Sequence, residues 1–212
     1  MPDDVTALAA RARTVADRNA RSGRRTLIGI AAPPGAGKST LARAVCSALG
    51  SDCVLVAMDG FHLAQAVLQR HGTSEVKGAP ETFDAEGYLA LLTRLRAVPR
   101  QRVYAPEFDR SLEQPIGSAV EVGPEADIVI TEGNYLLLDR PPWDRVCAVL
   151  DQTWYLEVPE EVRVRRLVAR HVAYGRTPEA ALRRATTGSD GANAALVIAH
   201  RDRADVIVTE SG

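Results

Sequence analysis

The segment TLIGIAAPPGAGKST, residues 26–40, joins an apolar run to a glycine-rich turn. Its first part, TLIGIAA (26–32), predicts a short buried strand because it is almost entirely apolar. Its second part, PPGAGKST, predicts a loop that enters a helix extending to about Leu49, with Gly50 as the stop signal. Glycines let backbone N–H groups turn inward, and a helix N-terminus adds a positive dipole. The segment therefore predicts a cradle for phosphate oxygens.

The residues of this loop have distinct expected roles. Lys38 would reach the β- and γ-phosphates of a bound nucleotide, and the Ser39 hydroxyl would sit on Mg²⁺. The full phosphate-loop pattern has glycine at the position of Ala32, so this chain must enter the loop with ordinary backbone dihedral angles. The predicted nucleotide-binding residues of the loop are Pro34, Gly35, Ala36, Gly37, Lys38, Ser39 and Thr40.

Length and composition limit the class of protein. The chain has 212 residues, 26 basic and 27 acidic side chains, a net charge of −1 and a hydrophobic fraction of 46%. This length predicts one domain over residues 1–212 that starts with a helical segment at 1–22, and the apolar fraction excludes whole-chain disorder. Near-neutral charge argues against binding to nucleic acid or to a membrane by bulk electrostatics. We expect a monomer or homodimer with a small-molecule partner.

Cysteine and lysine usage add two expectations. The three cysteines form no C-x-x-C pair, which argues against a disulfide framework and a zinc site. The N-terminus lacks the apolar segment of a secretory signal, so a cytoplasmic location is expected. Only Lys38 and Lys77 are lysines among the 26 basic residues, so each of them stands out.

Apolar strands alternate with helical segments along the chain. Further buried strands are predicted at 53–58, 127–131, 153–158 and 205–209. This alternation predicts an α/β fold with a parallel sheet covered on both faces. VYAPEF (103–108) and SAVEV (118–122) predict two short strands, interpreted as a hairpin on the sheet edge. The segment 71–84 has turn residues and no period, and predicts a loop.

Two acids follow predicted strands directly. Asp59 comes after the second strand and Glu132 after the third, and ligands of open α/β sheets bind at the carboxyl ends of the strands. Asp-Gly and Glu-Gly are also ordinary turn pairs. Beside a phosphate loop, however, phosphoryl transfer needs a metal site and a carboxylate that accepts the proton of the attacking hydroxyl. We expect Asp59 to act as the base and to lie near the metal, Glu132 to serve Mg²⁺ or its water shell, and His62 to hydrogen-bond the acceptor.

A basic segment follows the fourth strand. Seven arginines and one acid occur between Arg163 and Arg184, and Arg163, Arg166 and Arg170 share one helical face. A solvated basic face would explain this pattern. The functional alternative is a lid whose arginines close over a triphosphate and stabilise charge during transfer.

Together these motifs resemble the P-loop kinases that include uridine kinase, phosphoribulokinase and the bacterial type of pantothenate kinase. The resemblance spans roughly residues 25–210, and its middle motifs are most similar to small bacterial nucleoside/nucleotide kinase-family, fructose-transport-associated kinase-like proteins. It rests on IAAPPGAGKST, MDGFH (58–62), KGAPETFD (77–84), VYAPEFDRS (103–111), VITEGNY (129–135), RVRRLVARHVAYGR (163–176) and HRDRADVIV (200–208).

The resemblance implies a three-layer α/β/α P-loop NTPase fold with a mostly parallel sheet, a helical lid (159–200) and a small β-hairpin insertion within an acceptor-pocket region (71–122). It implies ATP and Mg²⁺ as cofactors. Asp59 is similar to the family's catalytic base, and Glu132 to its metal-side acid, which also borders the acceptor. The implied phosphate-gripping lid residues are Arg166, Arg170 and Arg176. The implied acceptor-pocket residues are Glu81, Asp84, Tyr104, Phe108, Arg110 and Asn193.

The sequence leaves several functions open. The first is an ATP-dependent kinase for a hydroxyl of a small metabolite such as a sugar, a nucleoside or a pantothenate-like compound. Asp109 beside Arg110 would suit a polyhydroxylated acceptor, or the two side chains would form a surface pair with each other. The alternatives are a nucleoside-monophosphate or dephospho-coenzyme A kinase, and a catalytically silent nucleotide-binding protein. A guanine-specific switch is disfavoured because no Asn-Lys-x-Asp segment exists. Asn193 would touch acceptor or phosphate, or serve as a helix cap or turn residue.

Overall fold

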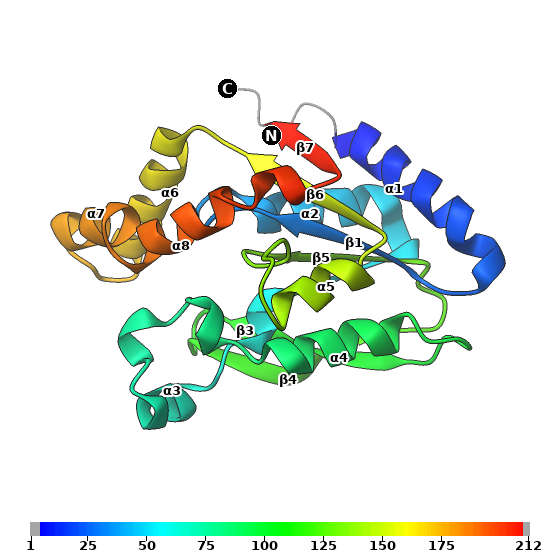
Figure 1. Ribbon diagram of the computed structural model, residues 1–212, viewed down its shortest axis with the longest axis horizontal. Coiled ribbons are helices and arrows are strands. Elements are labelled where there is room, and N and C mark those ends of the chain that lie inside the picture. Colours follow the sequence, from blue (N-terminus) through cyan, green and yellow to red (C-terminus); the bar gives the residue numbers. More distant parts are fainter. Residues whose placement is uncertain (1–4, 210–212) are drawn as a thin grey trace.

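The computed structural model describes residues 5–209, and its centre is a five-stranded parallel sheet in the order β2-β5-β1-β6-β7 (Figure 1). Residues 1–4 of the predicted N-terminal segment lie outside this range. The strands are β1 (Thr26–Ala31), β2 (Cys53–Ala57), β5 (Ile128–Gly133), β6 (Gln152–Glu157) and β7 (Val206–Thr209). All five agree with strands predicted from apolar runs, and every residue of β1 and β5 is buried.

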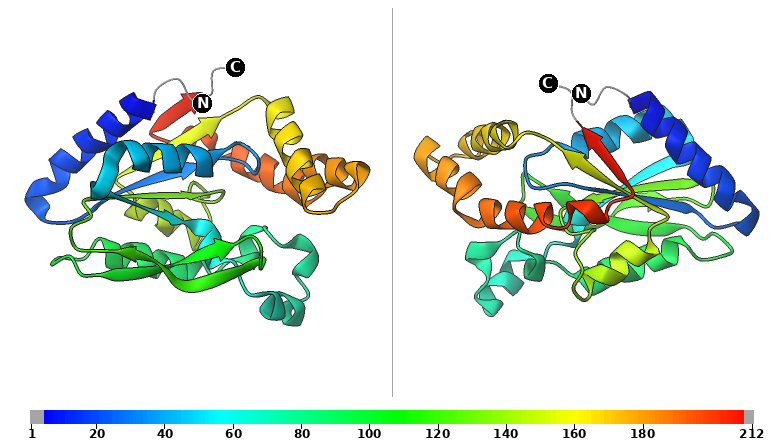
Figure 2. Two further views of the ribbon diagram at one scale, coloured as in Figure 1. Left: turned by 180° about the vertical axis from the view of Figure 1, so that it is seen from behind. Right: turned by 45° about the horizontal axis from the view of Figure 1, so that its top comes forward.

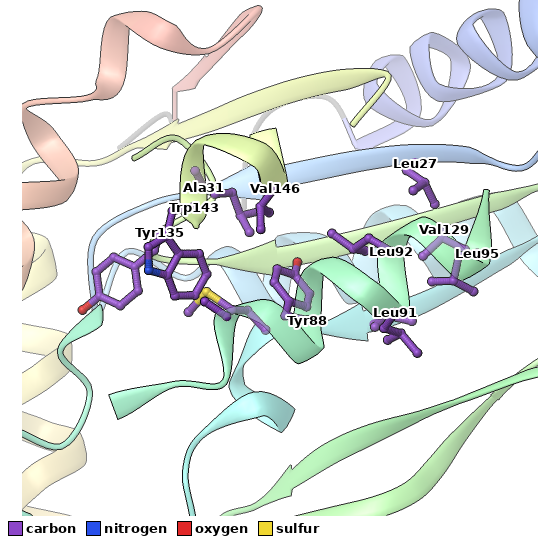
Figure 3. Packing of buried hydrophobic residues seen from close by; sticks show 14 of the residues in the cluster. Leu27, Ala31, Tyr88, Leu91, Leu92, Leu95, Val129, Tyr135, Trp143 and Val146 are labelled. Carbon is purple, nitrogen blue, oxygen red and sulfur yellow. The ribbon is translucent and has the colours of Figure 1, made fainter. Parts of the chain in front are cut away.

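Helices cover both faces of the sheet (Figure 2). On one face lie α1 (Val5–Asn19) and α2 (Lys38–Leu49), whose buried residues share one core cluster with Ile28, Ile30 and Trp154. On the other lie α4 (Ala85–Leu95) and the short α5 (Trp143–Val149), which the sequence analysis did not predict. Figure 3 shows the apolar side chains of α4 packed between β5 and α5, with Trp143 beside Tyr135. This sandwich confirms the three-layer α/β/α prediction.

The predicted hairpin forms, but it does not extend the main sheet. Strands β3 (Val103–Asp109) and β4 (Gln114–Val122) pair antiparallel as a separate two-stranded sheet. The prediction of an edge hairpin was therefore wrong. The physical reason is that Val103, Ala105 and Val122 are buried in the core cluster beneath α4, which leaves the hairpin packed on the fold by its side chains.

The remaining elements surround the carboxyl ends of the strands (Figure 1). A 3₁₀ turn (Met58–Phe61) follows β2 and leads to α3 (Gln65–His71), and the segment 71–84 is a loop with two further 3₁₀ turns. The predicted lid region folds as three helices: α6 (Glu160–Ala173), α7 (Pro178–Thr186) and α8 (Ser189–Ile198). Within residues 5–209, no helix is both long and apolar enough to cross a membrane.

Candidate active site

The carboxyl ends of β1, β5 and β2 meet at one edge of the sheet. Ile30 of β1 and Ala57 of β2 both pair with Glu132 of β5, so the phosphate loop, Glu132 and the turn bearing Asp59 emerge side by side. Parallel strands align their carboxyl ends in this way, and connecting loops there form ligand sites. The register therefore brings together the three motifs that the sequence singled out.

The loop between β1 and α2 has the backbone shape of a phosphate cradle. Gly35 and Gly37 have φ angles of 86° and 98°, which disfavour any side chain. A Cβ at Gly35 would also lie 2.8 Å from the carbonyl oxygen of Arg163, so α6 packs directly on the loop. Lys38 and Ser39 open α2, and the first N–H groups of a helix have no intrahelical acceptor. The loop can therefore present amides and a helix dipole to phosphate oxygens.

Ser39 and Glu132 form an oxygen pair behind this loop. Ser39 Oγ donates a 2.7 Å hydrogen bond to Glu132 Oε1, while Glu132 Oε2 is buried without a hydrogen-bond partner. Burial raises the pKa of the Glu132 carboxyl above its usual range, against the opposing effect of nearby Lys38. A hydroxyl and a carboxylate with an unused oxygen fit Mg²⁺, which takes few protein ligands and completes its shell with phosphate oxygens and water. The donor set thus suits a magnesium ion bound together with a nucleotide.

Asp59 lies in the turn after β2 and faces the same space. Its Oδ2 atom is 3.5 Å from Arg110 Nη2 at the tip of the hairpin. His62 Nδ1 lies 2.8 Å from the backbone oxygen of Asp59. Because a carbonyl oxygen only accepts, Nδ1 carries the proton in this contact. The ring of His62 contacts the rings of Phe83 and Phe108 in tilted arrangements, with centroid distances of 4.0 and 4.8 Å.

A cavity of about 730 Å³ connects these groups. One side consists of the phosphate loop, with Lys38, Ser39, Thr40 and Arg43 of α2. The other consists of the turn with Asp59 and His62, the loop at Lys77 and Gly78, the hairpin tip and Asn134. The lid helices close it with Arg166, Arg170, His171, Tyr174, Arg176, Arg184, Asp190 and Asn193. A volume of this order accommodates a nucleotide and a small second substrate.

The sequence matches one family over nearly its whole length. Residues 27–211 fit the model of the phosphoribulokinase / uridine kinase family. The chain belongs to this family. It is therefore a P-loop kinase that uses ATP and phosphorylates a hydroxyl group of a small molecule.

Three relatives illustrate the family around this kinase. The "putative uridine kinase C227.14" of Schizosaccharomyces pombe is 36% identical over 88% of the chain and 83% of its own length. The uncharacterized protein YggC of Escherichia coli is 36% identical over 89% of the chain and 80% of its length. A solved structure of a "putative fructose transport system kinase" from Silicibacter sp. TM1040 is 42% identical with a TM-score of 0.85, covering 94% of this chain and 98% of that one.

The predicted lid arginines of the kinase occupy different environments. Arg166 Nη1 donates to the carbonyl oxygen of Ala36 in the phosphate loop at 3.0 Å, and Arg176 lines the exposed end of the cavity. Burial and the nearby Arg110 lower the pKa of Arg170 from its ordinary value, and Arg170 makes no hydrogen bond or ion pair with another residue of 5–209. A guanidinium stays charged in proteins, so Arg110 and Arg170 are two cations that line the same cavity.

Arg163 has a role that the sequence did not predict for it. Its side chain is only 2% exposed, and its guanidinium donates to the carbonyl oxygens of Pro34 at 3.2 Å and Ala185 at 3.3 Å and pairs with Glu160. It therefore fastens α6 and α7 to the phosphate loop. Helical periodicity placed Arg163 on one face with Arg166 and Arg170, but periodicity alone does not distinguish a buried anchor from a ligand-facing cation.

The loop at residues 77–79 is held from the lid side and from the core side. Asn193 Nδ2 donates to the carbonyl oxygen of Gly78 at 3.1 Å, and the hydroxyl of Tyr135 donates to the same oxygen. Lys77 Nζ donates to the carbonyl oxygen of Glu113 at 2.9 Å and lies over the ring of Phe108. Lys77, the second of two lysines in an arginine-rich chain, was a signal that the site prediction did not use.

Not every residue assigned to the acceptor pocket reaches the cavity. His62, Phe108, Arg110 and Asn193 line it, whereas Glu81 and Tyr104 do not. Glu81 is exposed in a 3₁₀ turn, and Tyr104, 49% exposed, lies on β3 between two buried residues and so faces outward. Asp84 caps α4 by accepting from Gly87 N. The motifs that suggested these three residues do not show which side chains of a loop or hairpin face a cavity.

Proposed function

We propose that the protein transfers the γ-phosphoryl group of ATP to a hydroxyl of a small metabolite, with Asp59 as the base. The observation that supports this most directly is that Asp59 and Ser39 line one cavity together with Lys38, with Glu132 directly behind Ser39. The acceptor would enter from the side of His62 and the hairpin, and the nucleotide from the phosphate loop. The chain would act as one kinase domain, as a monomer or a homodimer.

In the proposed step the acceptor oxygen forms a bond to the γ-phosphorus, and the bond from that phosphorus to the bridging oxygen of ADP breaks. Asp59 takes the proton of the acceptor hydroxyl, and ADP leaves with the electrons of the broken bond. His62, with Nδ1 committed to the Asp59 carbonyl, offers Nε2 as a hydrogen-bond acceptor for the incoming molecule. This fixed tautomer would help to orient the hydroxyl.

Ser39 and Glu132 would hold Mg²⁺, with Asp59 near its water shell. When bound, the metal would neutralise charge on the β- and γ-phosphates. Lys38 would hold the same phosphates from the loop side. Arg166, Arg170 and Arg176 would cover the transferring group and exclude water that would otherwise hydrolyse ATP. The direct contact between Arg166 and the phosphate loop supports this arrangement.

The decisive test is an Asp59→Asn variant. We expect its rate of acceptor-dependent ADP formation to fall by about 10²–10⁴-fold, the usual contribution of a general base. The dissociation constant for MgATP, measured by calorimetry, should change by less than about threefold. Asp52→Asn, at a surface pair with Arg13, is the matched control with unchanged turnover. Wild-type turnover in Asp59→Asn would contradict the base assignment, and ATP binding without ADP formation for any acceptor would favour a silent binding protein.

A further inference from the structure

The hairpin tip and the lid present more cations to the acceptor side of the cavity than the acids there can neutralise. We infer that the acceptor carries a carboxylate or phosphate group besides its reacting hydroxyl, and that Arg110 and Arg170 bind this anionic group. This inference rests on the proposed function, because it concerns the second substrate of the same site. It names a class of substrate, small hydroxylated anions, rather than neutral sugars or nucleosides.

The first argument is the charge of the cavity wall. Eight basic side chains line the cavity against three acidic ones, a surplus of five positive charges. The triphosphate of ATP would offset part of this surplus, but Mg²⁺ cancels part of the triphosphate charge. A neutral acceptor would leave the remaining cations close together in a partly desolvated space, which is unfavourable. The basic residues are Lys38, Arg43, Lys77, Arg110, Arg166, Arg170, Arg176 and Arg184, and the acidic ones Asp59, Glu113 and Asp190.

The second argument is which of these charges are already paired. Asp190 lies 2.6 Å from His171 Nε2 and 3.6 Å from Arg184 Nε. Glu113 pairs with Lys77 at 3.7 Å. Arg170 forms no ion pair or hydrogen bond with an acid among residues 5–209; Arg110 disfavours its charge, while Asp190, Asp59 and Glu113 favour it from a distance. Two guanidinium groups that line one cavity can bind a further anion together, since their planar forks match carboxylate and phosphate.

The third argument is that the hairpin offers few acceptors to a neutral polyol. Asp109, which the sequence placed beside Arg110 as a sugar ligand, instead fixes the turn: its Oδ1 accepts from Ser111 N at 2.8 Å, Ser111 Oγ at 2.6 Å and Leu112 N at 3.1 Å. These hydrogen bonds lower the pKa of Asp109. The turn therefore uses the carboxylate internally and leaves the donor-only side chain of Arg110 directed at Asp59.

An anionic acceptor would also release the base. In the structure Arg110 has one acidic partner, Asp59, at 3.5 Å, within the residues described. A carboxylate or phosphate on the acceptor would compete for the guanidinium, so Asp59 would become available to the hydroxyl when the correct substrate is bound. This coupling predicts that the anionic group increases turnover as well as affinity.

The test compares acceptors that differ only in the anionic group. One arm pairs D-glycerate with glycerol and D-gluconate with D-glucitol; the other pairs ribose 5-phosphate with ribose and glucose 6-phosphate with glucose. ADP formation is measured with wild type, Arg110→Gln and the control Arg102→Gln, whose side chain pairs with Glu121 on the outer face of the hairpin. We expect kcat/KM at least tenfold higher for the charged member in one arm. Arg110→Gln should remove this preference in both KM and kcat, and Arg102→Gln should keep it.

A binding measurement decides the matter if no compound of the panel is phosphorylated. The protein is saturated with Mg²⁺ and the non-hydrolysable analogue AMP-PNP, and malonate and inorganic phosphate are titrated by calorimetry. Saturable binding that weakens at least tenfold in Arg110→Gln and not in Arg102→Gln supports the inference. Equal or better use of the neutral acceptors, or no saturable anion binding to the AMP-PNP complex, overturns it. Failure of AMP-PNP itself to bind would instead overturn the proposed function, and the inference with it.

Discussion

Asn193 of α8 donates a hydrogen bond to the carbonyl oxygen of Gly78, 115 residues earlier in the chain. The same oxygen accepts from the hydroxyl of Tyr135, just after β5. Gly78 has a φ of 101°, so the loop makes a turn there that a side chain would strain. One carbonyl group thereby joins the lid helices, the acceptor loop and the central sheet.

Asn193→Ala tests this connection. Loss of a hydrogen bond worth about 1 kcal/mol should loosen the acceptor loop and raise the KM for the acceptor about fivefold. The KM for ATP should stay unchanged because the phosphate loop keeps its own contacts. Steady-state kinetics with each substrate varied in turn give both values. Thr187→Ala, at the exposed end of α7, is the control; a change confined to ATP would contradict the positioning role of Asn193.

The Ser39–Glu132 pair predicts a specific magnesium dependence. Ser39→Ala and Glu132→Gln should each raise the Mg²⁺ concentration for half-maximal ADP formation about tenfold, since each removes or weakens one oxygen donor. The double variant should raise it by less than the product of the single effects, because both groups would act on one ion. Titration of Mg²⁺ at saturating ATP measures this. If the two effects multiplied fully, Ser39 and Glu132 would not act on the same ion.

Substitution of Arg163, which lies outside the reacting centre, should cause a large loss of stability. Arg163→Ala would leave the buried carbonyls of Pro34 and Ala185 without their donor and remove an enclosed side chain. We expect the free energy of unfolding to fall by about 3 kcal/mol. Arg165→Ala, on the exposed face of α6, should change it by less than about 0.5 kcal/mol. Urea denaturation compares the two variants, and similar values for both would refute the anchoring role.

His62 predicts how stability depends on pH. Burial lowers the pKa of His62 from its ordinary value, against the opposing effect of Asp59, while Lys77 lowers it further and Glu113 raises it. The unfolded chain then binds the proton more readily than the folded one below a pH of about 6.5, so stability falls as the pH falls through this range. His62→Gln should show a smaller loss between pH 7 and 5 than wild type, whereas His71→Gln, at the exposed end of α3, should not. An NMR titration of the His62 ring with a midpoint above 6.5 would contradict this.

The sequence predicted the parts of the fold that depend on local pattern. Apolar runs identified all five strands of the sheet, and the turn after β1 identified the phosphate loop. The proximity of Asp59 and Glu132 could be predicted because parallel strands end at one edge of the sheet, a rule that needs no side-chain detail.

The predictions that failed depended on contacts between residues that are distant in the sequence. The separate sheet of β3 and β4 follows from burial of Val103 and Ala105 against the core, which alternation alone does not reveal. Arg163 and Arg170 look alike on a helical face, yet one is an anchor and the other faces the cavity. Asp109 was interpreted as a ligand residue because sequence does not reveal the turn in which it accepts hydrogen bonds from Ser111 and Leu112.

The independence of the hairpin has an evolutionary consequence. Since β3 and β4 pair only with each other within the described residues, exchanging the tip that carries Arg110 would not disturb the ladder of the five-stranded sheet. Grafting the tip of one relative onto another should therefore change the acceptor specificity and leave the nucleotide-binding residues intact. Diversification within the family would then be concentrated in a segment that contributes no strand to the main sheet.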